Sequence, residues 1–398
     1  MSSAGSVRER AVHAGISAVV TCSLLLGALG ASRAPFDPMN ARDATTFPRA
    51  HGAHPGSALE WWYVTGTLRD DAGYRMGFQV TFFRARIDDP KRAQAAAGAA
   101  SAETSRPSAW RPGDLYFAHY AISDLTSRYY RFEERIGRTS VAIAGADSTD
   151  LRVWLRDWSL TRLEDGVFRL QAAGGMGALS VDLTPPRGTP VAWGQDYRSN
   201  KDPEGRSFSR YHTYPRMRVS GRFTAPGALP RPVRGTAWYD HEWTNGEYDP
   251  DLEGWDWFGL RLRDGRSLML YRMRDRFDGT AHLFGGIVEK DGRVRFFGKD
   301  EVRMDPLRTW VSPRSQARYP VAWRIVIDRP GESPMELDVS AVLSDQELDT
   351  ARSTRVAYWE GYVEGTAEEG DTKTKLEGYM ELTGYAGEGV PGRTGTPR

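Results

Sequence analysis

The chain has 398 residues, a length that suits two domains better than one small β-sandwich. It carries 53 lysine and arginine residues against 52 aspartate and glutamate residues, so its formal charge of +1 provides no global field to recruit nucleic acid. The single cysteine excludes an intramolecular disulfide framework and a metal site built from clustered cysteines.

The first 31 residues have the pattern of an export signal. Arg8 and Arg10 precede an apolar stretch, Ala11–Ala31, and small residues suited to cleavage lie at its end. We therefore expect residues 1–31 to be a signal peptide and the mature protein to be periplasmic or secreted. The stretch is also long enough to span a bilayer, so an uncleaved membrane anchor is the alternative.

From residue 59 onward, apolar and polar residues alternate with a period of two, which predicts strands. In Leu59–Leu68, Trp62 shares one face with Val64, and Trp61 shares the other with Tyr63. An Asp/Gly turn then leads into a second alternating run, Met76–Phe83, which predicts a hairpin. Further predicted strands are Leu115–Ser123, Met217–Phe223, Val233–Trp243, Trp255–Leu262, Leu268–Met273, Trp323–Ile327, Leu337–Leu343, Tyr358–Glu364 and Leu376–Leu382. Helical periodicity is nearly absent, and only Ser344–Thr350 favours a turn or two of helix.

Two segments of the chain echo each other. Glu60-Trp61-Trp62-Tyr63 resembles Trp255-Asp256-Trp257-Phe258, and each run leads into a turn that contains Asp and Gly. We therefore predict an all-β protein with two consecutive antiparallel domains, at residues 45–245 and 250–388. Each is large enough for an eight-stranded barrel, a size that can enclose one small ligand.

The segment Trp238–Trp243 is the most distinctive candidate site. On a strand, Tyr239, His241 and Trp243 share one face, while Asp240 and Glu242 lie on the other. Imidazole, phenol and indole groups on one wall of an apolar cavity could move a proton and stabilise a cation. The structural alternative is a hydrogen-bonded core histidine within a girdle of aromatic rings. The sequence contains no Gly-x-Ser-x-Gly motif and no metal-ligand spacing beyond two nearby histidines, so we predict no metal and no cofactor.

Several motifs, in order, resemble one known family. These motifs are the segments 60–66, 77–84, 197–217, 238–243 and 254–258, and the resemblance extends from about His54 to Tyr385. The sequence resembles the carotenoid 1,2-hydratase (hydroxyneurosporene synthase) family and the related AttH-like group of secreted double-lipocalin proteins. The resemblance implies two tandem lipocalin-like antiparallel β-barrels.

The resemblance also implies an activity and a set of residues. Hydratases of that family add water to the terminal double bond of an acyclic carotenoid. This implies catalytic roles for His241 and Trp243, and for a Tyr-x-Asp pair in which Tyr271 is our candidate tyrosine. Met273 stands where the aspartate would be, so Asp240, Asp256 and Glu60 are the candidate replacement acids. The substrate-binding candidates are Glu60, Trp61, Trp62, Tyr63, Tyr214, Tyr239, Trp255 and Trp257.

Three functions remain open at this stage. The first is a hydro-lyase or related enzyme that acts on an isoprenoid or polyene-like substrate. The second is a carrier of a hydrophobic small molecule, and the third is an accessory of an envelope ABC transporter. Titratable groups that converge inside a cavity would favour the enzyme, whereas an apolar cavity with few such groups would favour the carrier.

Overall fold

The computed structural model describes residue 44 and residues 46–86, 114–245, 251–277, 279–354 and 356–386. The predicted signal peptide therefore lies outside the described residues. Within them, no helix is both long enough and apolar enough to cross a membrane.

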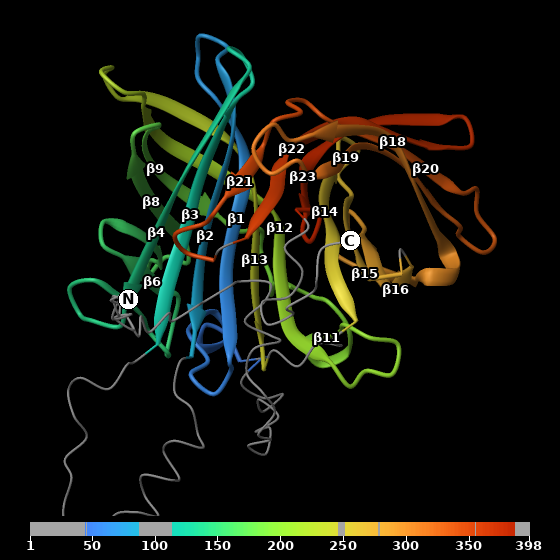
Figure 1. Ribbon diagram of the computed structural model, residues 1–398, viewed down its shortest axis with the longest axis horizontal. Helices are drawn as coiled ribbons and strands as arrows, with labels where there is room; N and C mark the ends of the chain where they lie inside the picture. Colours follow the sequence, from blue (N-terminus) through green and yellow to red (C-terminus); the bar gives the residue numbers. More distant parts are fainter. Residues whose placement is uncertain are drawn as a thin grey trace, which may run out of the picture.

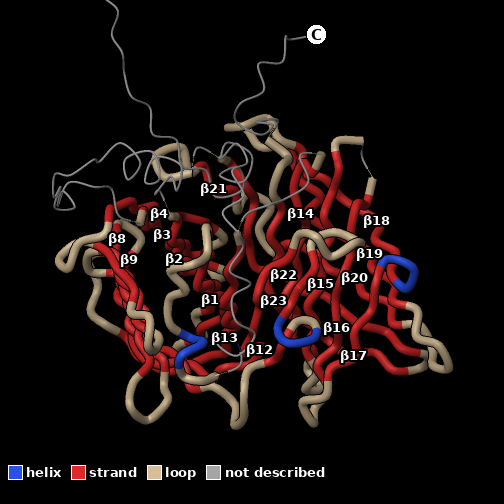
Figure 2. Tube along the Cα trace, turned by 90° about the horizontal axis from the view of Figure 1, so that it is seen from below, coloured by secondary structure: helices blue, strands red, loops and turns tan. Residues whose placement is uncertain are grey.

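Two antiparallel sheets make up the protein, as the alternating sequence predicts (Figures 1 and 2). The first sheet has the strands β1 (Leu59–Arg69), β2 (Arg75–Ala85), β3 (Leu115–Asp124), β4 (Tyr129–Arg138), β5 (Ala144–Ala146), β6 (Arg152–Leu155), β7 (Trp158–Arg162), β8 (Phe168–Gly174), β9 (Gly177–Thr184), β10 (Val191–Ala192), β11 (Arg198–Asn200), β12 (Phe208–Thr224) and β13 (Arg231–Thr244). The second sheet has the strands β14 (Leu252–Leu262), β15 (Ser267–Asp275), β16 (Thr280–Val288), β17 (Val294–Gly298), β18 (Val302–Val311), β19 (Arg318–Ile327), β20 (Met335–Ala341), β21 (Glu347–Asp349), β22 (Ala357–Glu369) and β23 (Thr372–Leu382). Short 3₁₀ helices lie at Arg49–His51 (η1), Gln195–Tyr197 (η2) and Lys299–Glu301 (η3).

The two sheets share one strand order. The first runs β4-β3-β2-β1-β13-β12, and the second runs β17-β16-β15-β14-β23-β22. In each sheet the first strand therefore lies between the second strand and the last, which matches the sequence echo between β1 and β14. Contacts of β4 with β5 and β6 close the first sheet into a barrel, and the second sheet curls into a half-barrel. The predicted fold class is confirmed.

One predicted element is wrong. Residues 344–350 form no helical turn, because Glu347–Asp349 instead pairs with β22 as the short strand β21. Glu347 is fully buried there and accepts a hydrogen bond from Tyr319 Oη at 3.0 Å, a contact that holds the segment extended.

Buried apolar residues form separate cores. One fills the first barrel and includes Trp62, Val64 and Tyr239. A second fills the half-barrel and includes Trp323 and Trp359. A third core lies between the two sheets, where Tyr63, Trp257, Tyr271, Tyr362 and Tyr379 meet. Strand β1 is therefore buried on both faces: one lines the first barrel and the other packs against the second sheet.

The pairing of β1 with β13 requires glycine at position 235. A side chain there would overlap the backbone of Thr67 and Leu68 on β1. We expect Gly235→Ala to lower the free energy of unfolding by about 2 kcal/mol, because the strands must separate to admit one methyl group. Urea denaturation measures this change. The matched control is Gly298→Ala, whose added methyl would meet nothing within 4 Å. Equal stability of the two variants would contradict the prediction.

Candidate functional site

Strand β13 divides the candidate motif between two environments. Its partner in the sheet is β1, with His241 opposite Trp62 and Asp240 opposite Tyr63. Tyr239, His241 and Trp243 are fully buried, and ring contacts place all three beside His212 within the first barrel. Asp240 and Glu242 line a cavity on the other face of the strand. The alternation read from the sequence is therefore present in the structure.

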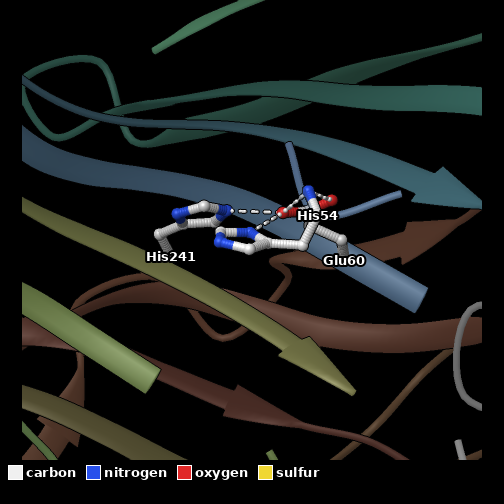
Figure 3. Close-up of side chains that lie close together, drawn as sticks. All are labelled: His54, Glu60 and His241. Atoms are coloured by element: carbon white, nitrogen blue, oxygen red, sulfur yellow. Dashed lines mark hydrogen bonds and ion pairs between the residues drawn. The ribbon is translucent and has the colours of Figure 1, made fainter. Parts of the chain in front are cut away.

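Inside the first barrel, four side chains form a group that we call the histidine cluster: His54, Glu60, Arg84 and His241. Glu60 Oε1 lies 2.8 Å from His54 Nδ1 and 2.9 Å from His241 Nε2 (Figure 3). Its other oxygen, Oε2, accepts a hydrogen bond from Arg84 Nε at 2.9 Å. His241 Nδ1 lies 3.0 Å from the carbonyl oxygen of Ala50, so both ring nitrogens of His241 lie within hydrogen-bond distance of an oxygen.

Burial and the positive charge of Arg84 act on Glu60 in opposite directions. Burial raises the pKa of the Glu60 carboxyl, but Arg84 and the two histidines lower it by more, so the pKa lies well below its ordinary value. Burial also lowers the pKa of His241 to about 4, although Glu60 acts against this shift. The cluster thus centres on a buried, ionised glutamate whose oxygens are all engaged.

The same residues offer the donor types of a metal site. Ligand atoms of His54, Glu60 and His241 lie within 4.8 Å of one another, and two imidazoles with one carboxylate are a common zinc set. Arg84, however, already places a positive charge against Glu60, which disfavours a divalent cation beside it. The side chains of Glu60 and His241 have no exposed surface, so no position is open to a substrate. Within the described residues, both oxygens of Glu60 and both ring nitrogens of His241 have hydrogen-bond partners without a metal, whereas His54 Nε2 has none.

Other predicted residues pack around this cluster. Trp62 stacks on His241 with ring centroids 4.8 Å apart, and Trp243 stacks on His54 at 3.7 Å. Tyr214 and Tyr239 contact His51 and Phe168 deeper in the same barrel. Together with Glu60 and His241, these residues line the interior of the first barrel rather than the cavity between the sheets.

The second group of predicted residues lines a cavity of about 100 Å³ between the two sheets, which we call the inter-barrel cavity. Its walls include the predicted residues Trp61, Tyr63, Asp240, Trp255, Trp257 and Tyr271. Among the titratable residues of the wall, the sequence analysis missed six as site members: Lys201, Tyr211, Glu242, Tyr358, Glu360 and Glu381. The strands that carry Glu242, Tyr358, Glu360 and Glu381 are predicted from the sequence, whereas Lys201 and Tyr211 lie outside the predicted strands. Nothing in the sequence signals which strand faces of the two barrels meet.

A chain of hydrogen bonds holds Asp240 at one end of this cavity. Asp240 Oδ2 accepts from Tyr211 Oη at 2.9 Å, and Oδ1 accepts from Trp238 Nε1 at 2.8 Å and from Thr213. Trp257 Nε1 in turn donates to Tyr211 Oη at 3.2 Å. Burial raises the pKa of Asp240 to about 7, although these donors favour the ionised form.

Glu242 and Lys201 form a buried ion pair beside Asp240. Lys201 Nζ lies 2.7 Å from Glu242 Oε1 and 4.3 Å from the centre of the Tyr271 ring. Tyr271 is fixed by Ser199 Oγ at 3.1 Å and by the carbonyl of Asn200. Lys201 therefore links Glu242 on β13 of the first sheet to Tyr271 on β15 of the second.

Glu360 and Glu381 form a carboxyl pair on the opposite wall. They are directly opposite each other in the pairing of β22 with β23, so their side chains lie on the same face. Burial, and then the neighbouring Glu381, raise the pKa of Glu360 well above its ordinary value. Burial raises the pKa of Glu381 to about 8, with further contributions from Glu242 and Asp240. Two such groups in a dry site cannot both ionise, so the pair retains a proton at neutral pH.

Comparison with known proteins identifies the family of this chain. The model of the family described as AttH-like matches residues 38–385. The chain belongs to the AttH-like family. A crystal structure of a protein described as AttH (NE1406), from Nitrosomonas europaea, is 34% identical to this AttH-like protein. It has a TM-score of 0.74, and the match covers 85% of this chain and 97% of the other.

Two more distant structures share the fold. Kievitone hydratase from Nectria haematococca is 16% identical, with a TM-score of 0.62, and the match covers 85% of this AttH-like protein and 92% of the hydratase. CghA in complex with Sch210972 is 13% identical, with a TM-score of 0.50, and the match covers 83% and 89% of the two chains. A comparison with curated proteins finds no match. The AttH-like and lipocalin-like parts of the resemblance are thus confirmed.

The histidine cluster yields a stability prediction for this AttH-like protein. We expect Arg84→Met to cost about 3 to 5 kcal/mol of the free energy of unfolding, because it leaves the Glu60 carboxylate buried without its cation. Chemical denaturation at neutral pH measures the loss. The control is Arg169→Met, which breaks the exposed pair with Asp182 and should cost no more than about 1 kcal/mol. If the two variants lose similar amounts, Glu60 does not depend on Arg84 for its charge.

Proposed function

We propose that this AttH-like protein is an exported hydro-lyase that adds water to an isolated alkene of an isoprenoid or polyene-like molecule. The observation that carries the proposal is the convergence of a proton-bearing carboxyl pair, an ion-paired carboxylate and aromatic rings on one cavity. The presence of a hydratase among the proteins that share the fold agrees with this assignment.

Hydration of an unactivated alkene determines which groups the site must supply. A proton must add to one alkene carbon, which leaves a carbocation on the other. Water then attacks the cation and loses a proton to a base. A water-poor site with a neutral acid, an ionised base and the negative faces of aromatic rings meets each of these needs.

Residues of the inter-barrel cavity fit these three roles. The Glu360–Glu381 pair supplies the proton, because one member is protonated at neutral pH. Glu242, held beside Lys201, orients the water and accepts its proton, after which the proton returns to the carboxyl pair through solvent. The rings of Trp61, Trp255 and Trp257 face the developing cation.

The four residues predicted as catalytic receive different roles under this proposal. His241 and Trp243 lie behind the cavity wall, so we assign them to positioning β13, which carries Asp240 and Glu242 on its opposite face. Tyr271 lines the cavity and holds Lys201 over its ring, so it supports the base. Asp240 accepts a hydrogen bond from Tyr211 and so orients that phenol in the cavity wall.

A carrier of a hydrophobic small molecule is the second candidate. The predominance of aromatic and apolar residues in the cavity wall favours it, because such walls bind apolar ligands without chemistry. Measured conversion of a bound molecule into product would distinguish the hydro-lyase from the carrier. The role beside an envelope transporter remains a prediction.

The test of catalysis is incorporation of ¹⁸O from labelled water into an acyclic carotenoid or a shorter isoprenoid alkene, followed by mass spectrometry. We expect product from the wild type and at least about a hundredfold loss of kcat in Glu381→Gln, which cannot donate its proton. The matched control is Glu336→Gln, an exposed acid on the second sheet, which should retain full activity. Absence of labelled product from the wild type would contradict the hydro-lyase and favour the carrier.

The pH dependence follows from the raised pKa of the acid. As the pH rises through about 8, Glu381 loses its proton, so kcat should fall on the alkaline side. The same group is neutral in the folded state but ionises near its ordinary pKa in the unfolded chain. The wild type therefore loses stability as the pH rises from the ordinary pKa of glutamate toward 8. Glu381→Gln lacks this loss, so its free energy of unfolding should increase relative to that of the wild type over this range. A variant less stable than the wild type at pH 8 would contradict the assignment.

A further inference from the structure

A second hollow lies between the barrels, further along the same face of β1. Trp61 and Tyr63 of that face line the inter-barrel cavity, whereas Thr67 and Arg69 line this second hollow, which has a volume of about 900 Å³. Two residues of the third core, Tyr362 and Tyr379, are fully buried on the intervening parts of β22 and β23. We call the second hollow the arginine groove.

Cations from both sheets converge on this groove. The first sheet contributes Arg69, Arg75, Arg218 and Arg234, and the second contributes Arg263 and Lys375. These six positive charges face three acids that line the same groove, Asp338, Glu364 and Glu377. In a chain whose total formal charge is +1, such local excess is a specific feature of this surface.

The acids in the groove are already engaged, whereas most of the cations are not. Asp338 pairs with Arg324 at 2.8 Å, Glu364 with Arg75 at 2.6 Å, and Glu377 accepts from Thr67 and Tyr362 at 3.1 Å. In contrast, four exposed cations form no ion pair with any residue that the structure describes. These are Arg69, Arg218, Arg263 and Lys375.

The strand register adds an independent observation. Arg69 on β1 is directly opposite Arg75 on β2 and also directly opposite Arg234 on β13. Residues that are directly opposite in an antiparallel pair have side chains on the same face, and like charges at such positions destabilise a sheet. Arg75 and Arg234 pair with Glu364 and Asp71, whereas Arg69 between them forms no ion pair with any described residue. The stability of the barrel therefore does not account for Arg69 at this position in the row of three arginines.

We propose that the arginine groove binds a phosphate-bearing anion. Guanidinium groups match the oxygens of phosphate with paired hydrogen bonds, and a bound anion removes the repulsion within the row. Free di- or polyphosphates and the phosphate of a lipid headgroup share this chemistry. The site is separate from the inter-barrel cavity, so the proposal does not depend on the hydro-lyase.

The experiment uses the purified chain and sodium pyrophosphate as the probe, at constant ionic strength set with NaCl. Calorimetric titration gives the Kd, and thermal unfolding gives the midpoint with and without the probe. The test variant is Arg69→Gln/Arg263→Gln. The matched control, Arg222→Gln/Arg318→Gln, removes two exposed arginines that are not among the groove-lining residues. A second arm measures cosedimentation with phosphatidylglycerol vesicles and with phosphatidylcholine vesicles.

We expect saturable binding by the wild type and the control, and a loss of affinity of about tenfold or more in the test variant. Without probe, the test variant should unfold at the same temperature or higher, because the repulsion within the row is relieved. Binding to phosphatidylglycerol vesicles without binding to pyrophosphate would support the site and identify the headgroup as the source. Failure of both probes, or equal losses in the test and control variants, would overturn the proposal.

Discussion

The antiparallel pairing of β1 with β13 is the contact on which both candidate sites depend. Along these two strands, successive side chains enter different environments. Glu60 and His241 point into the first barrel and hold each other there, while Trp61 and Asp240 form part of the wall that faces the second sheet. Any change of register by one residue would exchange these environments and place charged groups in the wrong interior.

Carboxyl groups buried on the two sides of this pair behave in opposite ways. Glu60 is ionised because Arg84 and two imidazoles surround it, and so it acts as a structural anchor. Glu381 and Glu360 face each other without a cation between them in the described structure, so they retain a proton. The same residue type thus provides an anchor at one site and a candidate acid at the other, and the neighbours alone decide which.

Much of the architecture follows from local sequence patterns. The alternation of Trp61, Trp62 and Tyr63, the Asp/Gly turns and the echo between β1 and β14 predict strands, hairpins and two similar sheets. The position of Glu381 in the site could not be predicted in the same way. It depends on which residue of β22 lies opposite it and on how the second sheet packs against β1, and both are long-range contacts. The role of His241 shows the same limit. The alternation of residues 238–243 predicts that its side chain points into the barrel, but it does not predict the hydrogen bond that engages its ring with Glu60.

Infrared spectroscopy of the protonated carboxyl stretch tests the central claim most directly, because it detects the proton on the Glu360–Glu381 pair without any assumption about substrate. The account predicts a protonated-carboxyl band at pH 7 in the wild type that shifts in ²H₂O, weakens as the pH is raised past about 8, and loses intensity in the Glu360→Gln/Glu381→Gln variant, where the remaining band comes from Asp240, whose pKa is about 7. A wild-type spectrum at pH 7 with no such band, or one left unchanged by the double substitution, would contradict it.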